Sequence, residues 1–200
     1  MLAAVILSGG ASTRMGTPKA LLPYRGETFL QYLLRVTDHT RIAARRVVLG
    51  ADALAIQATL HLQPDEIVIN QEWSKGQLSS IQAALKNLPP DTDGMLLCLI
   101  DHPFVSAKLI DELIGHFYSS RKRIVLPVYN GRRGHPVIFA SSLYDELVAA
   151  PLETGARAVV WAHHEDVLEM PTIEEGCVLN LNDRDDMARA ITGADPGQLI

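Results

Sequence analysis

The sequence contains little cysteine. Cys98 and Cys177 are the only two in 200 residues, and no Cys-x-x-Cys spacing occurs. A disulfide framework or a structural zinc site needs several cysteines at short spacings, so this scarcity excludes both. Free thiols persist in reducing compartments. We therefore expect a protein that folds without disulfides and is located in the cytoplasm.

Long runs of one residue type are also missing. No Lys/Arg-rich run occurs and the formal net charge is -5, which argues against a surface that binds nucleic-acid phosphates. The apolar run Leu2–Leu7 follows Met1 without a charged leader, and it is too short for a signal peptide or a membrane span. We expect neither a nucleic acid nor a membrane as a partner.

The composition is that of a globular domain. Hydrophobic residues make up 48% and charged residues 20% of the chain. A chain of 200 residues can bury a sizeable core without help from a metal. Internal repeats and linkers are missing, so we predict a single domain over residues 1–192, followed by a flexible tail at 193–200.

Short apolar runs alternate with stretches of helical periodicity. The predicted strands are Ala3–Leu7, Arg46–Gly50, Glu66–Asn70, Met95–Ile100, Ile124–Val128, Pro136–Phe139 and Val167–Met170. The predicted helices are Thr28–Val36, Ala53–Leu60, Leu78–Leu88, Ala107–Tyr118, Ser142–Ala149, Gly155–His163 and Asp183–Ile191. This alternation is typical of an α/β three-layer sandwich with a mostly parallel, doubly wound sheet, which binds ligands at the carboxyl ends of its strands. The Gly-containing loop within residues 122–139 predicts a hairpin or a locally mixed sheet.

The loop after the first strand combines glycines with basic side chains. Glycines let backbone N–H groups face an anion, and Arg and Lys add positive charge. This loop predicts a triphosphate cradle in which Arg14 and Lys19 act as catalytic residues, although it matches neither a Walker loop nor Gly-x-Gly-x-x-Gly. Taken alone, a solvated turn explains the loop equally well. The cradle residues are Leu7, Ser8, Gly9, Gly10, Arg14, Gly16 and Lys19.

The full spelling of residues 7–21, Leu-x-Gly-Gly-x-Ser-x-Arg-Met-Gly-x-Pro-Lys-Ala-Leu, resembles the signature of the molybdopterin nucleotidyltransferases. Later segments resemble that family's further motifs in the same order, at residues 70–81, 99–105, 134–139, 155–157 and 179–183. The resemblance implies the nucleotide-diphospho-sugar transferase (glycosyltransferase-A-like) fold. It also implies transfer of a nucleoside monophosphate from a triphosphate to the terminal phosphate of molybdopterin, with release of pyrophosphate and with a molybdoenzyme or its chaperone as a further partner.

Asp101 is the strongest candidate for a metal ligand. It directly follows a predicted apolar strand, so we expect its carboxylate at the ligand-binding edge of the sheet, where it would bind Mg²⁺ together with phosphate oxygens. A turn or helix-entry role is the alternative. Many relatives carry an Asp as second ligand where this chain has Asn180 and Asn182. We expect Asn182 to contribute an amide oxygen, which leaves the site one negative charge weaker.

Four residues match the family segment that lines the base and ribose, namely Asn70, Gly76, Ser79 and Ser80. The glycine permits close approach of a ligand, and the hydroxyls can bond to sugar or base edges. Capping of the helix that begins nearby explains Ser79 equally well.

His135 and Arg157 match the acceptor side of the family's site. The imidazole can donate to a phosphate or a pterin and the guanidinium can bind an anion. The alternatives are a histidine fixed by a turn and an arginine that covers a helix. His102 adjoins Asp101, but we expect it to point away from the site, since successive side chains in an extended segment alternate between sides.

The nucleobase receives two opposed signals. Gly9-Gly10 resembles the loop associated with guanylyl transfer, whereas residues 70–80 and 134–139 resemble the cytidylyl branch. We favour CTP, with GTP as the alternative. A sugar-1-phosphate acceptor is a second alternative. A non-catalytic nucleotide or cofactor carrier is a third, against which Arg14, Lys19 and Asp101 together argue.

Overall fold

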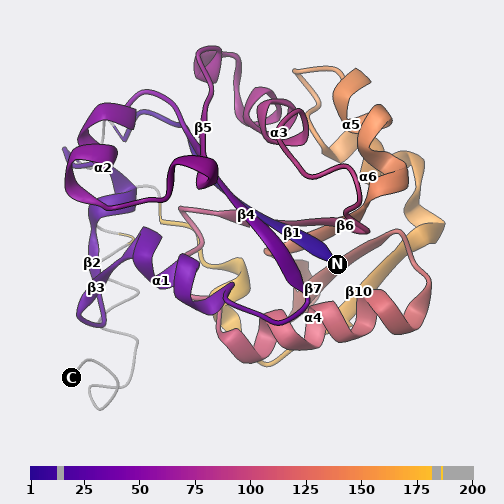
Figure 1. Cartoon of the computed structure of the whole chain (residues 1–200). Coiled ribbons are helices and arrows are strands. Elements are labelled where there is room, and N and C mark those ends of the chain that lie inside the picture. The colour runs from indigo at the N-terminus through magenta and orange to yellow at the C-terminus, as the bar shows by residue number, and fades with distance from the viewer. Residues whose placement is uncertain (13–15, 182–185, 187–200) are drawn as a thin grey trace.

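A computed structural model describes residues 1–12, 16–181 and 186 (Figure 1). Its strands are β1 (Leu2–Ser8), β2 (Pro23–Tyr24), β3 (Glu27–Thr28), β4 (Ile42–Leu49), β5 (Ile67–Ile69), β6 (Gly94–Leu99), β7 (Ile124–Tyr129), β8 (Arg132–Arg133), β9 (Val137–Ala140) and β10 (Val167–Pro171). Its α-helices are α1 (Phe29–Val36), α2 (Ala53–Thr59), α3 (Gln77–Leu85), α4 (Ala107–Ser120), α5 (Tyr144–Ala149) and α6 (Arg157–Ala162). Every predicted strand overlaps an observed strand, and the six predicted helices before residue 164 overlap α1 to α6.

One twisted sheet forms the middle layer, with the strand order β10-β7-β9-β6-β1-β4-β5 and with β8 attached to β7. Strand β1 lies parallel to both β4 and β6, and the pairs β4·β5 and β7·β10 are also parallel. Strand β9 runs antiparallel to both of its neighbours, β6 and β7. The mostly parallel sheet of the predicted fold class is therefore confirmed, with β9 as the mixed segment.

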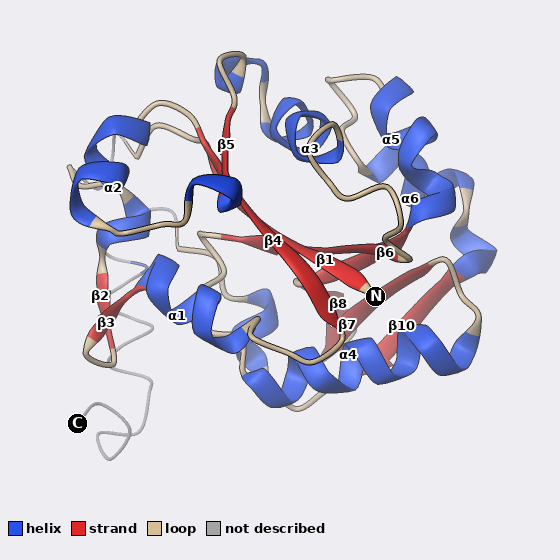
Figure 2. Ribbon diagram, viewed as in Figure 1, coloured by secondary structure: helices blue, strands red, loops and turns tan. Residues whose placement is uncertain are grey.

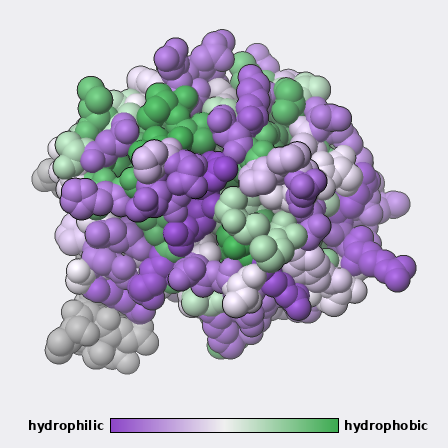
Figure 3. Space-filling view, in the orientation of Figure 1, coloured by the Kyte–Doolittle hydropathy of each residue, from purple (hydrophilic) through white to green (hydrophobic). Residues whose placement is uncertain are grey.

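Helices cover both faces of the sheet (Figure 2). Along β1, Ala4 and Ile6 pack on the side of α1, α2 and α4, whereas Val5 and Leu7 pack on the side of α3, α5 and α6. All seven residues of β1 are buried, as expected for a central strand covered on both faces. On the face shown in Figure 3, polar residues dominate and hydrophobic ones gather in the upper half, around α2 and β5.

The residues that precede the helices were expected to cap them, and two of the three described next do so. Thr28 forms a capping box with Gln31 at the start of α1, and the Ser106 hydroxyl accepts from the Leu109 N–H at the start of α4. Asp52 stands at the same position before α2 but makes no capping bond. Its carboxylate instead accepts from the Ser12 N–H at 3.4 Å, so it faces the loop after β1.

The two strands predicted within residues 122–139, β7 and β9, are antiparallel neighbours, so the predicted locally mixed sheet is present, and a tight hairpin joins β7 to β8. Strands β7 and β8 pair across Asn130 and Gly131, which have φ values of 47° and 76°. Positive φ at both central residues is the requirement of a type I′ turn. The two-residue strands β2, β3 and β8 were not predicted, because two residues are too short to show a periodicity.

Some predictions fall on residues outside the described part of the chain. These are the helix Asp183–Ile191 apart from Asp186, the domain boundary at residue 192 and the tail 193–200. Across the described residues, no helix has both the length and the apolar character that a membrane span requires.

Candidate active site

The carboxyl ends of β1, β4 and β6 meet at one edge of the sheet. There, the Leu7 carbonyl accepts from the Ile100 N–H at 3.1 Å, the Leu49 carbonyl accepts from the Asn70 N–H at 2.8 Å, and the Gly9 carbonyl accepts from the Ala51 N–H at 3.2 Å. These bonds join the segments that follow β1, β4, β5 and β6. These segments surround a cavity of about 240 Å³, which we call the donor cavity.

The predicted cradle lies in this cavity. The Ser12 hydroxyl accepts from the Lys19 N–H at 3.0 Å, so Lys19 is held next to Ser12. Gly16 is exposed with φ 69° and does not line the cavity. Arg14 lies outside the described residues. The cradle residues that line the donor cavity are Leu7, Ser8, Gly9, Gly10 and Lys19.

A buried polar cluster supports the cradle from below. The Asn70 side-chain amide donates to the hydroxyls of Ser79 at 2.9 Å and Ser80 at 3.0 Å. Ser79 also lies within 2.7 Å of the Gly76 carbonyl, so its hydroxyl is used inside the protein and it does not line the cavity. A Cβ atom at Gly9 would lie 2.9 Å from the Ser80 Oγ. Gly9, which resembles the guanylyl loop, and Ser80, which belongs to the segment that resembles the cytidylyl branch, are therefore in contact.

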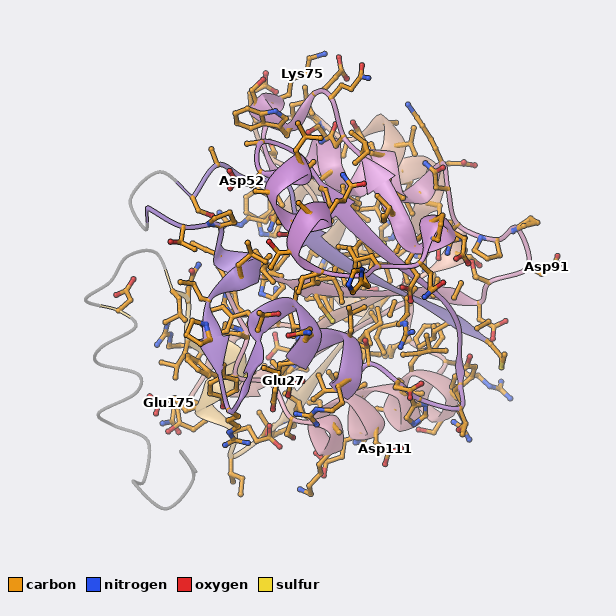
Figure 4. All side chains as sticks on the ribbon, turned by 60° about the vertical axis from the view of Figure 1, so that its left-hand side comes forward. Glu27, Asp52, Lys75, Asp91, Asp111 and Glu175 are labelled. Atoms are coloured by element: carbon orange, nitrogen blue, oxygen red, sulfur yellow. The ribbon has the colours of Figure 1, made fainter. Side chains whose placement is uncertain are left out.

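Two carboxylates line the donor cavity. Asp101 stands just beyond β6, as predicted, and Asp52 reaches the cavity from the start of α2. Figure 4 shows Asp52 at the same end of the molecule as Lys75, well away from Asp91 and Asp111. Among the described residues, no group of three or more His, Cys, Asp or Glu side chains is arranged to hold a metal ion. Asn182, the predicted second ligand, lies outside them.

His102 was expected to point away from the site if the extended conformation continued past Asp101; it does not line the donor cavity, but the extended conformation does not continue. The chain turns at Ile100 and Asp101, so the alternation of an extended strand ends there. His102 is buried, and its ring centroid lies 4.8 Å from that of His135. Burial lowers the pKa of His102 against the opposing effects of Asp101 and of a hydrogen bond to the Cys177 backbone. Its Nδ1 atom has no hydrogen-bond partner among the described residues.

A second cavity of about 660 Å³, which we call the acceptor cavity, lies beyond His135. His135, Arg157 and Arg133 line it together with apolar side chains, and Gln77 lines both cavities. Burial, followed by the charges of His102 and Arg157, lowers the pKa of His135 to about 3. His135 is therefore a neutral hydrogen-bonding group near pH 7.

Residues 174–181 fasten the loops between the two cavities. The Leu181 N–H donates to the Asp101 carbonyl at 2.8 Å, and the His135 N–H donates to the Cys177 carbonyl at 2.9 Å. The Ser106 hydroxyl donates to Glu174 at 2.6 Å. Asp101 and His135 are thus held by one short segment of chain.

The structure brings most of the predicted site residues together. Gly76, Ser80 and Asp101 join the cradle around the donor cavity, His135 and Arg157 lie in the acceptor cavity, and Asn70 and Ser79 lie beneath the cradle. The lining residues that the sequence did not single out include Asp52, Trp73, Gln77 and Trp161. Asp52 carried a signal, because an acidic residue directly after a strand and before a helix stands at the binding edge. Nothing in the local sequence distinguished the other three.

The low pKa of His135 predicts how stability changes with pH. Below about pH 6.5 the unfolded chain binds a proton at this histidine, whereas the folded chain does not until about pH 3. The free energy of unfolding should therefore fall as the pH falls through this window, by up to about 1.4 kcal/mol per pH unit for one proton. We expect His135→Gln to lose about 2 kcal/mol less than the wild type between pH 7 and pH 5, as measured by urea unfolding.

His116→Gln is the matched control, because His116 is exposed on α4. This variant should keep the wild-type pH dependence. A His135→Gln variant with the same pH dependence as the wild type would contradict the prediction.

The sequence is similar to a known protein family and to individual named proteins. Residues 4–167 match the model of the MobA-like NTP transferase domain. A protein named nicotine blue oxidoreductase from Paenarthrobacter nicotinovorans is 34% identical over 163 residues, which cover 76% of this chain and 78% of that protein. A protein named probable molybdenum cofactor guanylyltransferase from Bacillus cereus is 28% identical over 158 residues, covering 79% of this chain and 77% of that protein.

Solved structures agree with this placement. The crystal structure of Rv0371c from Mycobacterium tuberculosis H37Rv matches with a TM-score of 0.82 and 26% identity, covering 97% of this chain and 100% of that one. The same protein in complex with manganese matches with a TM-score of 0.77, over 96% of this chain and 99% of that one. The family model covers well over half of the sequence and includes the cradle, Asp101 and His135. The chain therefore belongs to the MobA-like NTP transferase family, a family of nucleotidyltransferases.

Proposed function

We propose that the chain transfers the CMP unit of CTP to the terminal phosphate of molybdopterin and releases pyrophosphate. The observation that supports this most directly is the pair of adjoining cavities. Lys19 and Asp101 line the donor cavity, His135 and Arg157 line the acceptor cavity, and Gln77 belongs to both. Two phosphate-bearing substrates can therefore approach each other from two sides.

The triphosphate of CTP would lie along the cradle. Backbone N–H groups of the glycine loop and the Lys19 ammonium would stabilise the negative charge that moves onto the departing pyrophosphate. We propose that Arg14, outside the described residues, adds a guanidinium to the same phosphates. The charge that develops at the leaving group is then met by groups held in place before the reaction.

Asp101 would hold a Mg²⁺ ion against the phosphates, with Asn182 as the proposed second ligand. This ion binds one or two carboxylates plus substrate phosphates and retains several waters, so a carboxylate in the cavity without a three-ligand cluster fits it. When bound, the ion neutralises charge on the reacting phosphate oxygens. The manganese complex of Rv0371c supports a divalent cation in this fold.

The acceptor would react from the other side. One oxygen of its terminal phosphate forms a bond to the α-phosphorus, the bond from the α-phosphorus to the bridging oxygen breaks, and the electron pair leaves with pyrophosphate. The acceptor phosphate is already an anion, so positioning and charge neutralisation suffice without a general base. Neutral His135 would donate a hydrogen bond to it, and Arg157 would supply the positive charge.

GTP is the second candidate for the donor. The Bacillus cereus relative is named a guanylyltransferase, and Gly9-Gly10 resembles the guanylyl loop. Segments 70–80 and 134–139 support CTP, and Ser80 of the first segment lies against Gly9.

We place the reaction in the cytoplasm, where the buried Cys98 and Cys177 stay reduced, with a molybdoenzyme or its chaperone as the recipient of the product.

Asp101→Asn should lower kcat for pyrophosphate release about a hundredfold or more, because the metal-binding carboxylate is lost. The assay contains Mg²⁺, each of CTP, GTP and UTP, and either molybdopterin or a sugar 1-phosphate. Asp91→Asn is the control, since Asp91 is exposed and distant from the donor cavity in Figure 4. It should remain as active as the wild type.

Several outcomes would contradict the proposal. An Asp101→Asn variant with full activity would remove Asp101 from the metal site, and release only with a sugar 1-phosphate would change the acceptor. No release with any pair would contradict nucleotidyl transfer altogether. In that case NAD(P)H consumption becomes the next measurement, because one relative is named an oxidoreductase.

Gly9 and Gly10 offer a matched pair for the donor. A Cβ at Gly9 would press on the Ser80 Oγ at 2.9 Å, whereas a Cβ at Gly10 would meet nothing within 4 Å. Gly9→Ala should therefore weaken Mg²⁺·CTP binding about tenfold, equivalent to about 1.4 kcal/mol, with a much smaller effect of Gly10→Ala, as measured by isothermal titration calorimetry. Adding Ser80→Ala to Gly9→Ala should restore part of the affinity. Equal losses in both single variants would show that the Gly9–Ser80 contact does not shape the donor cavity.

A further inference from the structure

Trp161 is a large aromatic side chain that the fold leaves uncovered. It is 62% exposed, and it makes no ring-stacking or cation–π contact with the described part of the chain. Its indole nevertheless lines the acceptor cavity rather than a convex surface. An exposed aromatic ring in a concave, partly apolar cavity is a common feature of small-molecule sites.

Arg157 precedes Trp161 by four residues on α6, so both side chains lie on the same face of that helix. Arg157 is exposed, and no carboxylate of the described chain lies within salt-bridge distance of it. Arg133, the other arginine of the cavity, is by contrast paired with Glu169 at 2.6 Å. Glu153 and the buried Phe139 also line the cavity, but Trp161 is its exposed aromatic side chain, and no salt bridge pairs Arg157 with a carboxylate of the described residues.

We propose that Trp161 is the stacking platform of the acceptor cavity, on which a planar fused heterocycle lies with its anionic group directed toward Arg157. This inference rests on the proposed function, and it assigns the ring-binding part of the acceptor site to a residue of α6. The heterocycle is sandwiched between the indole and the apolar wall formed by Leu97, Leu126 and Val137. A flat fused heterocycle can place its whole π-face on the indole in an offset-stacked arrangement.

The position of Trp161 relative to the reacting groups supports this assignment. His135 lines the same cavity, and its ring is tilted by 45° against the ring of His102, which follows Asp101 directly in the chain. An acceptor that rests on Trp161 can extend its phosphate past Arg157 and His135 toward the donor cavity. The cavity volume of about 660 Å³ is within the usual range for small ligands and leaves room for a fused ring with a side group.

The chain contains only two tryptophans, and each lines a different cavity: Trp73 the donor cavity and Trp161 the acceptor cavity. Their indole N–H resonances in ¹⁵N-correlated NMR spectra can be assigned with Trp73→Phe and Trp161→Phe. Titration with 6-carboxypterin, a planar fused heterocycle with one carboxylate, should shift the Trp161 resonance and leave that of Trp73 nearly unchanged. Mg²⁺·CTP should do the reverse.

Affinity then tests the stacking. Calorimetry with 6-carboxypterin should show a dissociation constant about tenfold higher for Trp161→Leu and less than about threefold higher for Trp161→Phe, because phenylalanine keeps an aromatic face. Arg157→Gln should also weaken binding. Ile173→Ala, which alters an exposed hydrophobic residue outside both cavities, should bind like the wild type.

The outcomes separate this inference from the proposed function. A pterin that shifts Trp161 in a protein that releases no pyrophosphate would support the platform and contradict the transfer reaction. Pyrophosphate release with an unshifted Trp161, and with an unchanged acceptor KM in Trp161→Leu, would overturn the platform. A Trp161 resonance that responds to protein concentration but not to the pterin would also overturn it, and would make this face a contact between copies of the chain.

Discussion

The parallel pairing of β1 with both β4 and β6 is the constraint on which the site depends. Ser8 pairs with Leu49, and Leu7 pairs with both Val48 and Leu99, so all three strands end at the same level of the sheet. The cradle loop, the Asp52 turn and Asp101 therefore leave the sheet side by side. Because β1 is packed on both faces, a one-residue slip would move each side chain into the differently packed core on the other face, and this cost fixes the position of the cradle.

The acceptor side depends on a different kind of constraint. Strand β9 runs against its neighbours, and the segment before it reaches the acceptor cavity with His135. Cys177 holds that segment through its carbonyl and also bonds to the His102 ring. The two buried histidines are thus neutral groups packed between a cavity lined by Lys19 and Asp101 and a cavity lined by Arg157. The charged groups Lys19, Asp101 and Arg157 line the cavities on either side of these neutral histidines, an arrangement that suits a reaction between two anions.

The sequence predicted the fold, and it predicted that the cradle residues and Asp101 lie at one edge of the sheet, because periodicity and glycine-rich turns act locally. Strand β1, the helix starts at Thr28 and Ser106, and the position of Asp101 all follow from neighbouring residues. The alternation expected for His102 does not apply, because β6 ends at Leu99 and the chain then turns. Trp161 and Gln77 were missed because their roles come from α6 and α3 meeting around a cavity, which no local pattern encodes. Two-residue strands such as β8 are likewise set by a turn and a partner strand.

Hydrogen exchange with and without Mg²⁺·CTP tests the central claim, that the edge shared by β1, β4 and β6 is the donor site. The account predicts slower exchange on nucleotide addition in segments 8–12, 70–80 and 99–102 together, because they surround one cavity. Segment 152–161, which borders the acceptor cavity, should change little until an acceptor is added. Protection confined to 152–161, or absent from the cradle while the nucleotide is bound, would contradict the account.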